Sequence, residues 1–170
     1  SDLRATYTGG FFDLLTPFPL LCGLVSSSLL TFHGANYLII RTEGDVQARA
    51  RRASLIAGSL MVILFILAGV WVSQLKGYTI TSGALHNAPA NPLHKTVSTS
   101  VGAWLNNYRQ YPFTMLFPVL GIVGGLLALW AAKARRGHIA FIASSIAGAG
   151  VLVTAGASMF PFMLPSSLNP

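Results

Sequence analysis

Charged residues are scarce in this sequence of 170 residues. They make up 9% of the chain and only four are acidic, whereas 53% of the residues are hydrophobic. A soluble domain usually carries about 25% charged residues, so water is not the main solvent of this chain. None of the acidic residues lies within the long apolar runs. A proton or cation path built inside the membrane by this chain would therefore lack its usual carboxylate.

Cysteine is almost absent as well. The one thiol, Cys22, lies inside an apolar run, so no disulfide can form within the chain. We interpret Cys22 as a small, buried apolar residue. The sequence also has no phosphate-binding loop, no cysteine pair, and no set of serine, histidine and aspartate typical of nucleophilic catalysis. We therefore expect no catalytic, cofactor-binding or metal-ligating residue in this chain.

Four apolar runs are long enough to cross a bilayer, which takes about 20 helical residues. They cover residues 17–40, 53–75, 112–132 and 138–164. This pattern predicts an all-α integral membrane protein. We expect a single membrane domain in which four transmembrane helices form an antiparallel bundle.

Basic residues cluster in the two short connections between these runs. Residues 41–52 and 133–137 hold seven of the eleven Lys and Arg residues. Basic residues close to membrane helices mark the cytoplasmic face, so we expect both turns in the cytoplasm and both ends of the chain outside. The same clustering argues against nucleic-acid binding, because the Lys and Arg residues lie at the ends of apolar runs and do not form the continuous basic surface that binds nucleic acid. The seven residues are Arg41, Arg49, Arg51, Arg52, Lys133, Arg135 and Arg136.

The segment between the second and third runs, residues 76–111, is polar and rich in Gly, Pro, Asn, Ser and Thr. We expect a structured extracytoplasmic loop here. The spacing of apolar residues over 97–108 predicts a short helix on the membrane surface. His86 and His94 lie in this loop without a nearby Cys or carboxylate, which is weak support for a metal site.

One face of the first run carries polar residues at helical spacing. Polar groups at bilayer depth must face protein or water, so we expect this face to be buried against other helices. Within it, His33 is the only histidine in the middle of an apolar run. One interpretation is a haem ligand, for which a partner chain would have to supply a second imidazole. The other, commoner case is a hydrogen-bonded packing histidine. The face consists of Cys22, Ser26, Leu29, His33, Asn36 and Tyr37.

Small residues recur in the last two runs. Gly121 and Gly125 form a small-xxx-small pair, which lets a neighbouring helix approach closely. Gly148 belongs to a nearly continuous surface of small residues in the fourth run. We expect Gly148→Leu to disrupt assembly by overpacking.

Several blocks, in order along the chain, resemble the second, smaller core subunit of cytochrome bd-type quinol oxidases, including their cyanide-insensitive relatives. The resemblance covers only the C-terminal part of that subunit. The chain also begins with Ser1 and a polar stretch rather than with Met, so we expect a piece or a processed product of a longer protein. The blocks are LLTPFPLLCGL at 14–24, HGANYLIIRTEG at 33–44, RARR at 49–52, FILAGVWV at 65–72, NPLHKTV at 91–97, GAWLNN at 102–107 and TAGASMFPFMLPSS at 154–167.

The resemblance implies a structural, non-haem subunit of a terminal oxidase that oxidises quinol and reduces dioxygen to water in aerobic respiration, in the bacterial inner membrane. It implies a larger partner subunit that carries haem b and haem d. Relatives hold a quinone between their helices, which would suit apolar grooves in this chain. The acidic half of the family's subunit lies outside this chain, so no proton-pathway residue transfers to it. The alternative function is a small multi-span transporter or channel, favoured by the polar stripe through His33 and Asn36.

Overall fold

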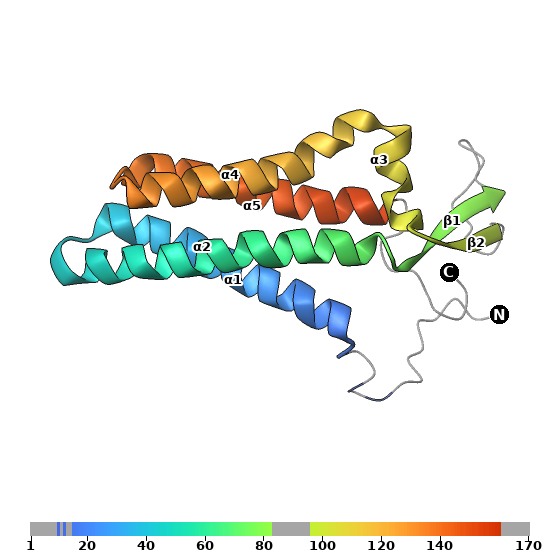
Figure 1. Ribbon diagram of the computed structural model, residues 1–170, viewed down its shortest axis with the longest axis horizontal. Helices are drawn as coiled ribbons and strands as arrows, with labels where there is room; N and C mark the ends of the chain where they lie inside the picture. Colours follow the sequence, from blue (N-terminus) through green and yellow to red (C-terminus); the bar gives the residue numbers. More distant parts are fainter. Residues whose placement is uncertain (1–9, 11, 13–14, 83–95, 161–170) are drawn as a thin grey trace, which may run out of the picture.

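Four long helices form an elongated bundle in the computed structural model, which describes residues 10, 12, 15–82 and 96–160 (Figure 1). Each helix is long and apolar enough to cross a membrane, with α4 counted together with the 3-10 turn before it. The predicted all-α membrane bundle is thereby confirmed. The helices are α1 (Pro17–Arg41), α2 (Gly44–Val72), α4 (Leu116–Lys133) and α5 (Gly137–Met159).

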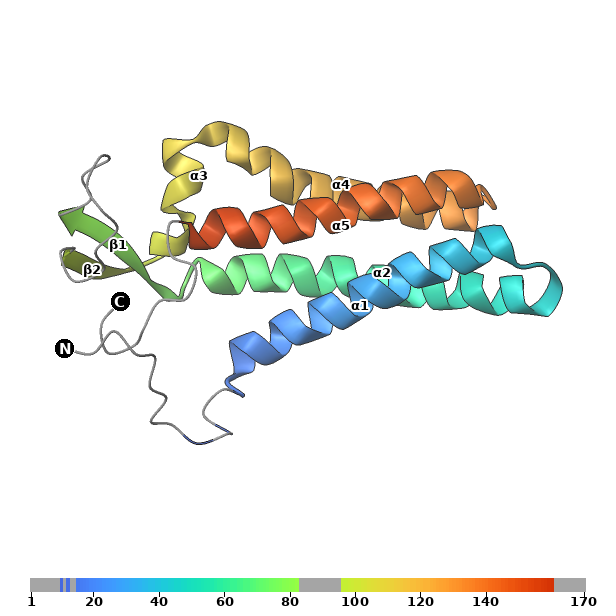
Figure 2. The same cartoon turned by 180° about the vertical axis from the view of Figure 1, so that it is seen from behind.

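The helices form two hairpins, α1–α2 and α4–α5, which lie side by side (Figures 1 and 2). Helix α2 packs against α4, and α1 packs against α5. The largest fully buried side chains in the core between them are Phe32 of α1 and Met61 of α2. Small residues of α4 and α5 belong to the same core, which lets the helices approach closely. These small residues are Ala128, Ala143 and Ala147.

Helix α2 begins earlier than the sequence predicts. It starts at Gly44 rather than at residue 53, so most of the segment 41–52 is helical and only Thr42 and Glu43 form the turn. Gln, Ala and Arg favour helices, and Asp45 in the first turn stabilises the positive end of the helix dipole. The arginines of this segment therefore project from a helix. With the 3-10 turn that precedes α4 counted in, the other helix ends fall within three residues of the predicted spans, except that α5 ends at Met159, and residues 161–164 lie outside the described residues.

The connection between α2 and α4 contains a two-stranded antiparallel sheet. Strand β1 (Lys76–Ser82) pairs with β2 (Thr96–Val101), with an irregularity between Ile80 and Ser82. The helix predicted over 97–108 is therefore wrong in its first half, where β-branched Thr and Val favour a strand. Gly102, at φ 73°, then turns the chain into short helical turns. These are η3 (Ala103–Leu105), α3 (Asn106–Gln110) and η4 (Pro112–Met115).

Helices α4 and α5 approach each other backbone to backbone. A Cβ atom added at Gly150 would lie 2.6 Å from the amide nitrogen of Gly121 and 2.8 Å from the carbonyl oxygen of Phe117. The close approach predicted at Gly121 is confirmed. Gly125 faces α2 instead, where an added Cβ would lie 2.9 Å from Cγ2 of Val62.

Gly148 lies outside this tight contact. An added Cβ would meet only Leu29 among the described residues, at an ordinary distance of 3.7 Å. Two residues along a helix correspond to about 200° of rotation, so Gly148 and Gly150 face different neighbours. Within this chain the tight backbone contact is therefore at Gly150, and the disruption of assembly expected from Gly148→Leu stays a prediction.

Candidate functional site: an apolar groove

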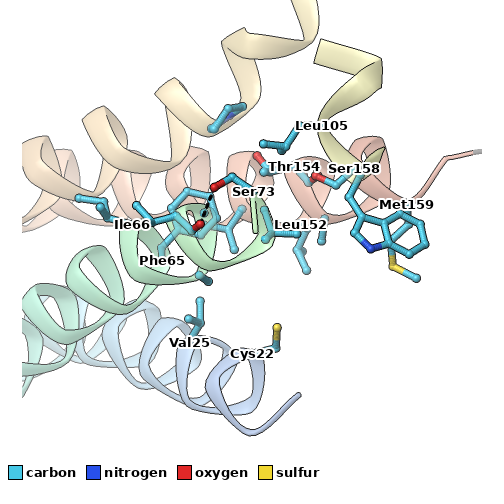
Figure 3. A pocket seen from close by; sticks show the side chains of 18 of the residues that line it. Cys22, Val25, Phe65, Ile66, Ser73, Leu105, Leu152, Thr154, Ser158 and Met159 are labelled. Carbon is cyan, nitrogen blue, oxygen red and sulfur yellow. Dashed lines mark hydrogen bonds between the residues drawn. The ribbon is translucent and has the colours of Figure 1, made fainter. Parts of the chain in front are cut away.

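Helix α1 diverges from the other helices toward its N-terminal end (Figures 1 and 2). Beside this end lies a groove of about 880 Å³, which is within the range of about 300–1,000 Å³ typical of ligand pockets. Figure 3 shows that its walls come from segments far apart in the sequence. Lining residues include Cys22 and Val25 of α1, Phe65 of α2 and Ser73 just after it, and Leu152 and Ser158 of α5.

Three hydroxyl groups that line the groove donate their protons to backbone carbonyls within the same stretch of chain. Ser73 Oγ donates to the carbonyl oxygen of Val70 at 2.6 Å. Thr154 Oγ1 donates to the carbonyl of Gly150 at 2.6 Å, and Ser158 Oγ donates to the carbonyl of Thr154 at 2.8 Å. Each oxygen keeps lone pairs that can accept a further hydrogen bond. The groove therefore suits a long apolar molecule with a hydrogen-bond donating end.

Tyr108 anchors α3 to the end of α5 beside the groove. Its side chain is 6% exposed, and its hydroxyl donates to the carbonyl oxygen of Thr154 at 3.0 Å and lies 2.9 Å from Oγ of Ser158. The neighbouring Asn107 donates from Nδ2 to the carbonyl of Ala157 at 2.7 Å. These bonds hold the polar connection against the bundle and close one end of the groove.

We expect Tyr108→Phe to lower the free energy of unfolding by about 0.5–1.5 kcal/mol, because the hydrogen bond from Tyr108 to the carbonyl of Thr154 is lost while Ser158 still donates to that carbonyl. Burial raises the pKa of the Tyr108 phenol, and the smaller effect of the Ser158 hydrogen bond lowers it. A raised pKa stabilises the folded state below the unfolded value of about 10, and this contribution is lost as the pH rises through the folded pKa. Thermal unfolding in detergent should show the difference between wild type and Tyr108→Phe shrinking above about pH 10.

Tyr111→Phe is the matched control, because Tyr111 is exposed near Tyr108 and its described contact is a ring contact with Phe113. This variant should unfold like the wild type. Equal melting temperatures for Tyr108→Phe and wild type at neutral pH would contradict the anchoring role of Tyr108.

His33 belongs to the contact between α1 and α5. Its Nδ1 lies 3.0 Å from Oγ of Ser144, and its ring stacks on Phe141 with centroids 4.8 Å apart. Ser144 Oγ donates its proton to the carbonyl of Phe141 at 2.8 Å, so Nδ1 of His33 is the donor to Ser144. This geometry is that of the hydrogen-bonded packing histidine.

The alternative interpretation of His33, a haem ligand, stays a hypothesis. One face of the His33 ring is stacked on Phe141, and Nδ1 lies 3.0 Å from Oγ of Ser144. A hydrogen bond at Nδ1 is compatible with iron binding at Nε2. The other described histidine, His138, is exposed in the first turn of α5, so a partner chain would have to supply the second imidazole.

Asn36 and Ser54 form a polar pair inside the bundle. Both are 0% exposed, and Oγ of Ser54 donates to Oδ1 of Asn36 at 2.7 Å. Nδ2 of Asn36 has no hydrogen-bond partner among the described residues. The pair joins α1 to α2 near the end of the bundle where the two helices turn.

The predicted polar face of α1 is buried over only part of its length. Leu29 and Asn36 are buried and His33 is half-buried. Cys22, expected to be buried, and Ser26 are exposed and line the groove, because α1 diverges there. Tyr37 is exposed as well.

No group of three or more His, Cys, Asp or Glu side chains gathers within residues 15–82 and 96–160. His86 and His94 lie outside the described residues, so the weak metal pair stays a hypothesis. The expected absence of catalytic, cofactor-binding and metal-ligating residues stays a prediction.

Comparison with known proteins assigns nearly the whole chain to one protein family. The model of a family described as cytochrome bd terminal oxidase subunit II matches residues 1–169. A Haemophilus influenzae protein described as a probable cytochrome oxidase subunit 2 is 46% identical over 167 residues, which are 98% of this chain and 44% of that protein. Cytochrome bd-I ubiquinol oxidase subunit 2 of Escherichia coli K12 is 43% identical over 166 residues, again 44% of the relative. The chain thus spans less than half the length of these curated relatives.

Proposed function

Because the chain belongs to the cytochrome bd terminal oxidase subunit II family, we propose that it is a structural, non-haem part of a complex that oxidises quinol and reduces dioxygen to water. The family match over nearly the whole chain carries this proposal. It favours an oxidase subunit over the alternative of a small transporter or channel. The four helices of membrane-spanning length suit a scaffold role.

We propose a larger subunit with haem b and haem d as the partner. Haem bound there would supply the electron transfer from quinol to dioxygen, and this chain would support and position that subunit. Support comes from the large apolar side chains exposed on the outer faces of all four helices, which suit contact with lipid and with another membrane protein. We place the complex in the bacterial inner membrane, with the two basic turns in the cytoplasm and both ends of this chain outside.

We further propose that the groove beside α1 holds a quinone. Its apolar walls, among them Phe18 and Phe65, suit an isoprenoid tail. The oxygens of Ser73 and Ser158 would accept hydrogen bonds from the hydroxyl groups of the reduced ring. A bound quinone would supply a reservoir of electrons and protons, and the chain's own part is to bind and orient it.

A reduced-minus-oxidised absorption spectrum tests the proposed function. The full-length protein is purified in mild detergent together with whatever accompanies it, and the components are identified by mass spectrometry. We expect haem b and haem d bands only in fractions that contain a larger subunit. His33→Ala should leave these bands intact. Haem retained without a partner, or no haem and no partner, would contradict the proposal.

Filling the groove tests the quinone site. Ser26 lines the groove from α1, and Ser26→Phe should lower the quinone recovered by solvent extraction about 5- to 150-fold, as expected from an overpacking penalty of about 1–3 kcal/mol. Ser27→Phe is the matched control, because Ser27 is exposed on the same helix but does not line the groove. Equal quinone content in the two variants would rule out the groove as the site.

A further inference from the structure

The α1–α2 turn and the α4–α5 turn lie at the same end of the bundle (Figure 1), and basic residues flank both turns in the sequence. The α4–α5 turn packs directly against the end of α1, because a Cβ added at Gly137 would lie 3.1 Å from Cγ2 of Ile39 and 3.4 Å from Cγ1 of Ile40. Arg41, next to Ile40, therefore lies near Arg136, next to Gly137. With Arg135 these arginines form one corner of the bundle, which we call the arginine corner.

Two of the three arginines of the arginine corner contact an aromatic ring. Within the described residues, none of the three forms an ion pair. The guanidinium of Arg41 lies 5.6 Å from the ring centre of Tyr37, and that of Arg136 lies 5.8 Å from the ring centre of Trp130. All three arginines are exposed. The corner therefore presents positive charge that is free to meet an anion.

Arg135 adopts a backbone conformation that usually belongs to glycine. Its φ is 58°, in the left-handed region. The amide of Arg136 donates to the carbonyl of Ala131 at 2.9 Å and that of Arg135 to the carbonyl of Ala132 at 3.3 Å, which makes Arg135 the C′ residue of a Schellman motif. Glycine fills this position without steric strain. A cation in this strained conformation is consistent with a role for its side chain.

We propose that the arginine corner binds the headgroup of an anionic phospholipid. The planar guanidinium groups of Arg135 and Arg136 can each donate two hydrogen bonds to a phosphate. Trp130 and Tyr37 are 54% and 47% exposed beside them, as aromatic residues at a membrane interface are. Exposed Leu38 adds apolar surface for acyl chains. Basic pockets between transmembrane helices are known to hold such headgroups.

Lipid selectivity in bilayers tests this site independently of the oxidase assignment. The full-length protein, with any partner it retains, is reconstituted with spin-labelled phosphatidylglycerol or spin-labelled phosphatidylcholine, and the motionally restricted fraction is measured by electron paramagnetic resonance. We expect a preference for phosphatidylglycerol. Arg135→Gln combined with Arg136→Gln should reduce that preference about fivefold for each charge removed.

Three further variants make the result specific. Arg109→Gln removes an exposed cation of α3, at the opposite end of the bundle, and should leave the preference unchanged. Arg135→Lys with Arg136→Lys should retain most of it. Arg135→Gly should raise the melting temperature, because strain is relieved, and still weaken lipid selectivity. The proposal is overturned if the double Gln variant keeps the wild-type preference, or if it releases a protein partner while the lipid preference stays the same.

Discussion

Gly150→Ala is expected to separate α4 from α5. The added methyl group would lie 2.6 Å and 2.8 Å from backbone atoms of Gly121 and Phe117. A backbone atom cannot rotate away as a flexible side chain can, so the helices themselves must move. We expect a loss near the upper end of the range of about 1–3 kcal/mol for overpacked cores. Unfolding of the purified protein in mixed micelles, followed by tryptophan fluorescence, measures this loss.

Gly148→Ala is the matched control for this expectation. It makes the same chemical change two residues away, where the nearest described atom, Cδ1 of Leu29, is 3.7 Å from the added Cβ. Alanine is also the better helix former by about 1 kcal/mol, so this variant should be as stable as the wild type or more stable. A Gly150→Ala protein with unchanged stability would show that α4 and α5 do not pack as described.

Phe32→Ala is expected to be the most damaging change on α1. The ring is 0% exposed at the centre of the bundle. Phe→Ala in the core of a water-soluble protein costs about 3–5 kcal/mol. Part of that cost is the free energy of transferring the side chain from water, and this part is absent for a helix that is already in lipid. We therefore expect Phe32→Ala to lower the free energy of unfolding by on the order of 2–3 kcal/mol. The same unfolding measurement gives the value.

A double-mutant cycle with Gly58 isolates the packing of this ring. A Cβ at Gly58 would lie 2.5 Å from Cε2 of Phe32, so Gly58→Ala alone should destabilise the protein by about 1–3 kcal/mol. In the Phe32→Ala background the ring is gone but Cδ2 of Leu129, at 2.8 Å, still crowds the added Cβ, so Gly58→Ala should cost clearly less than in the wild type. Gly69→Ala, with no described atom near the added Cβ on the same helix, is the control. Additive effects of the two changes would show that Phe32 does not pack on Gly58.

The four spans follow from the sequence because length and hydropathy decide them. The start of α2 does not, because arginines beside a membrane helix suit a loop and an extended helix equally well, and helix propensity decides between them only weakly. The strand β2 was mistaken for a helix for a related reason. Val97 and Val101 match helical spacing, yet both are β-branched, as is Thr99 between them, and all three pair with β1.

The groove is the feature that sequence reasoning could not locate. Its walls combine residues as distant as Cys22, Phe65 and Leu152, and they exist only because α1 diverges at one end. No local pattern sets the angle between two helices. The polar stripe of α1 offered a partial signal: its residues Cys22 and Ser26 line the groove, whereas Asn36 is buried within the bundle.

The polar pairs His33–Ser144 and Asn36–Ser54 fix α1 near its C-terminal end, far from the groove. His33 bonds to α5 and Asn36 bonds to α2, so two successive turns near one end act as a pivot. Phe18, at the groove, lies 18 residues from Asn36, an arm of about 27 Å at about 1.5 Å per residue. A ligand that widens the groove by about 3 Å at Phe18 would therefore rotate α1 by only about 6°. We therefore expect occupants of different thickness to need only a small tilt of α1, which would leave both polar pairs intact.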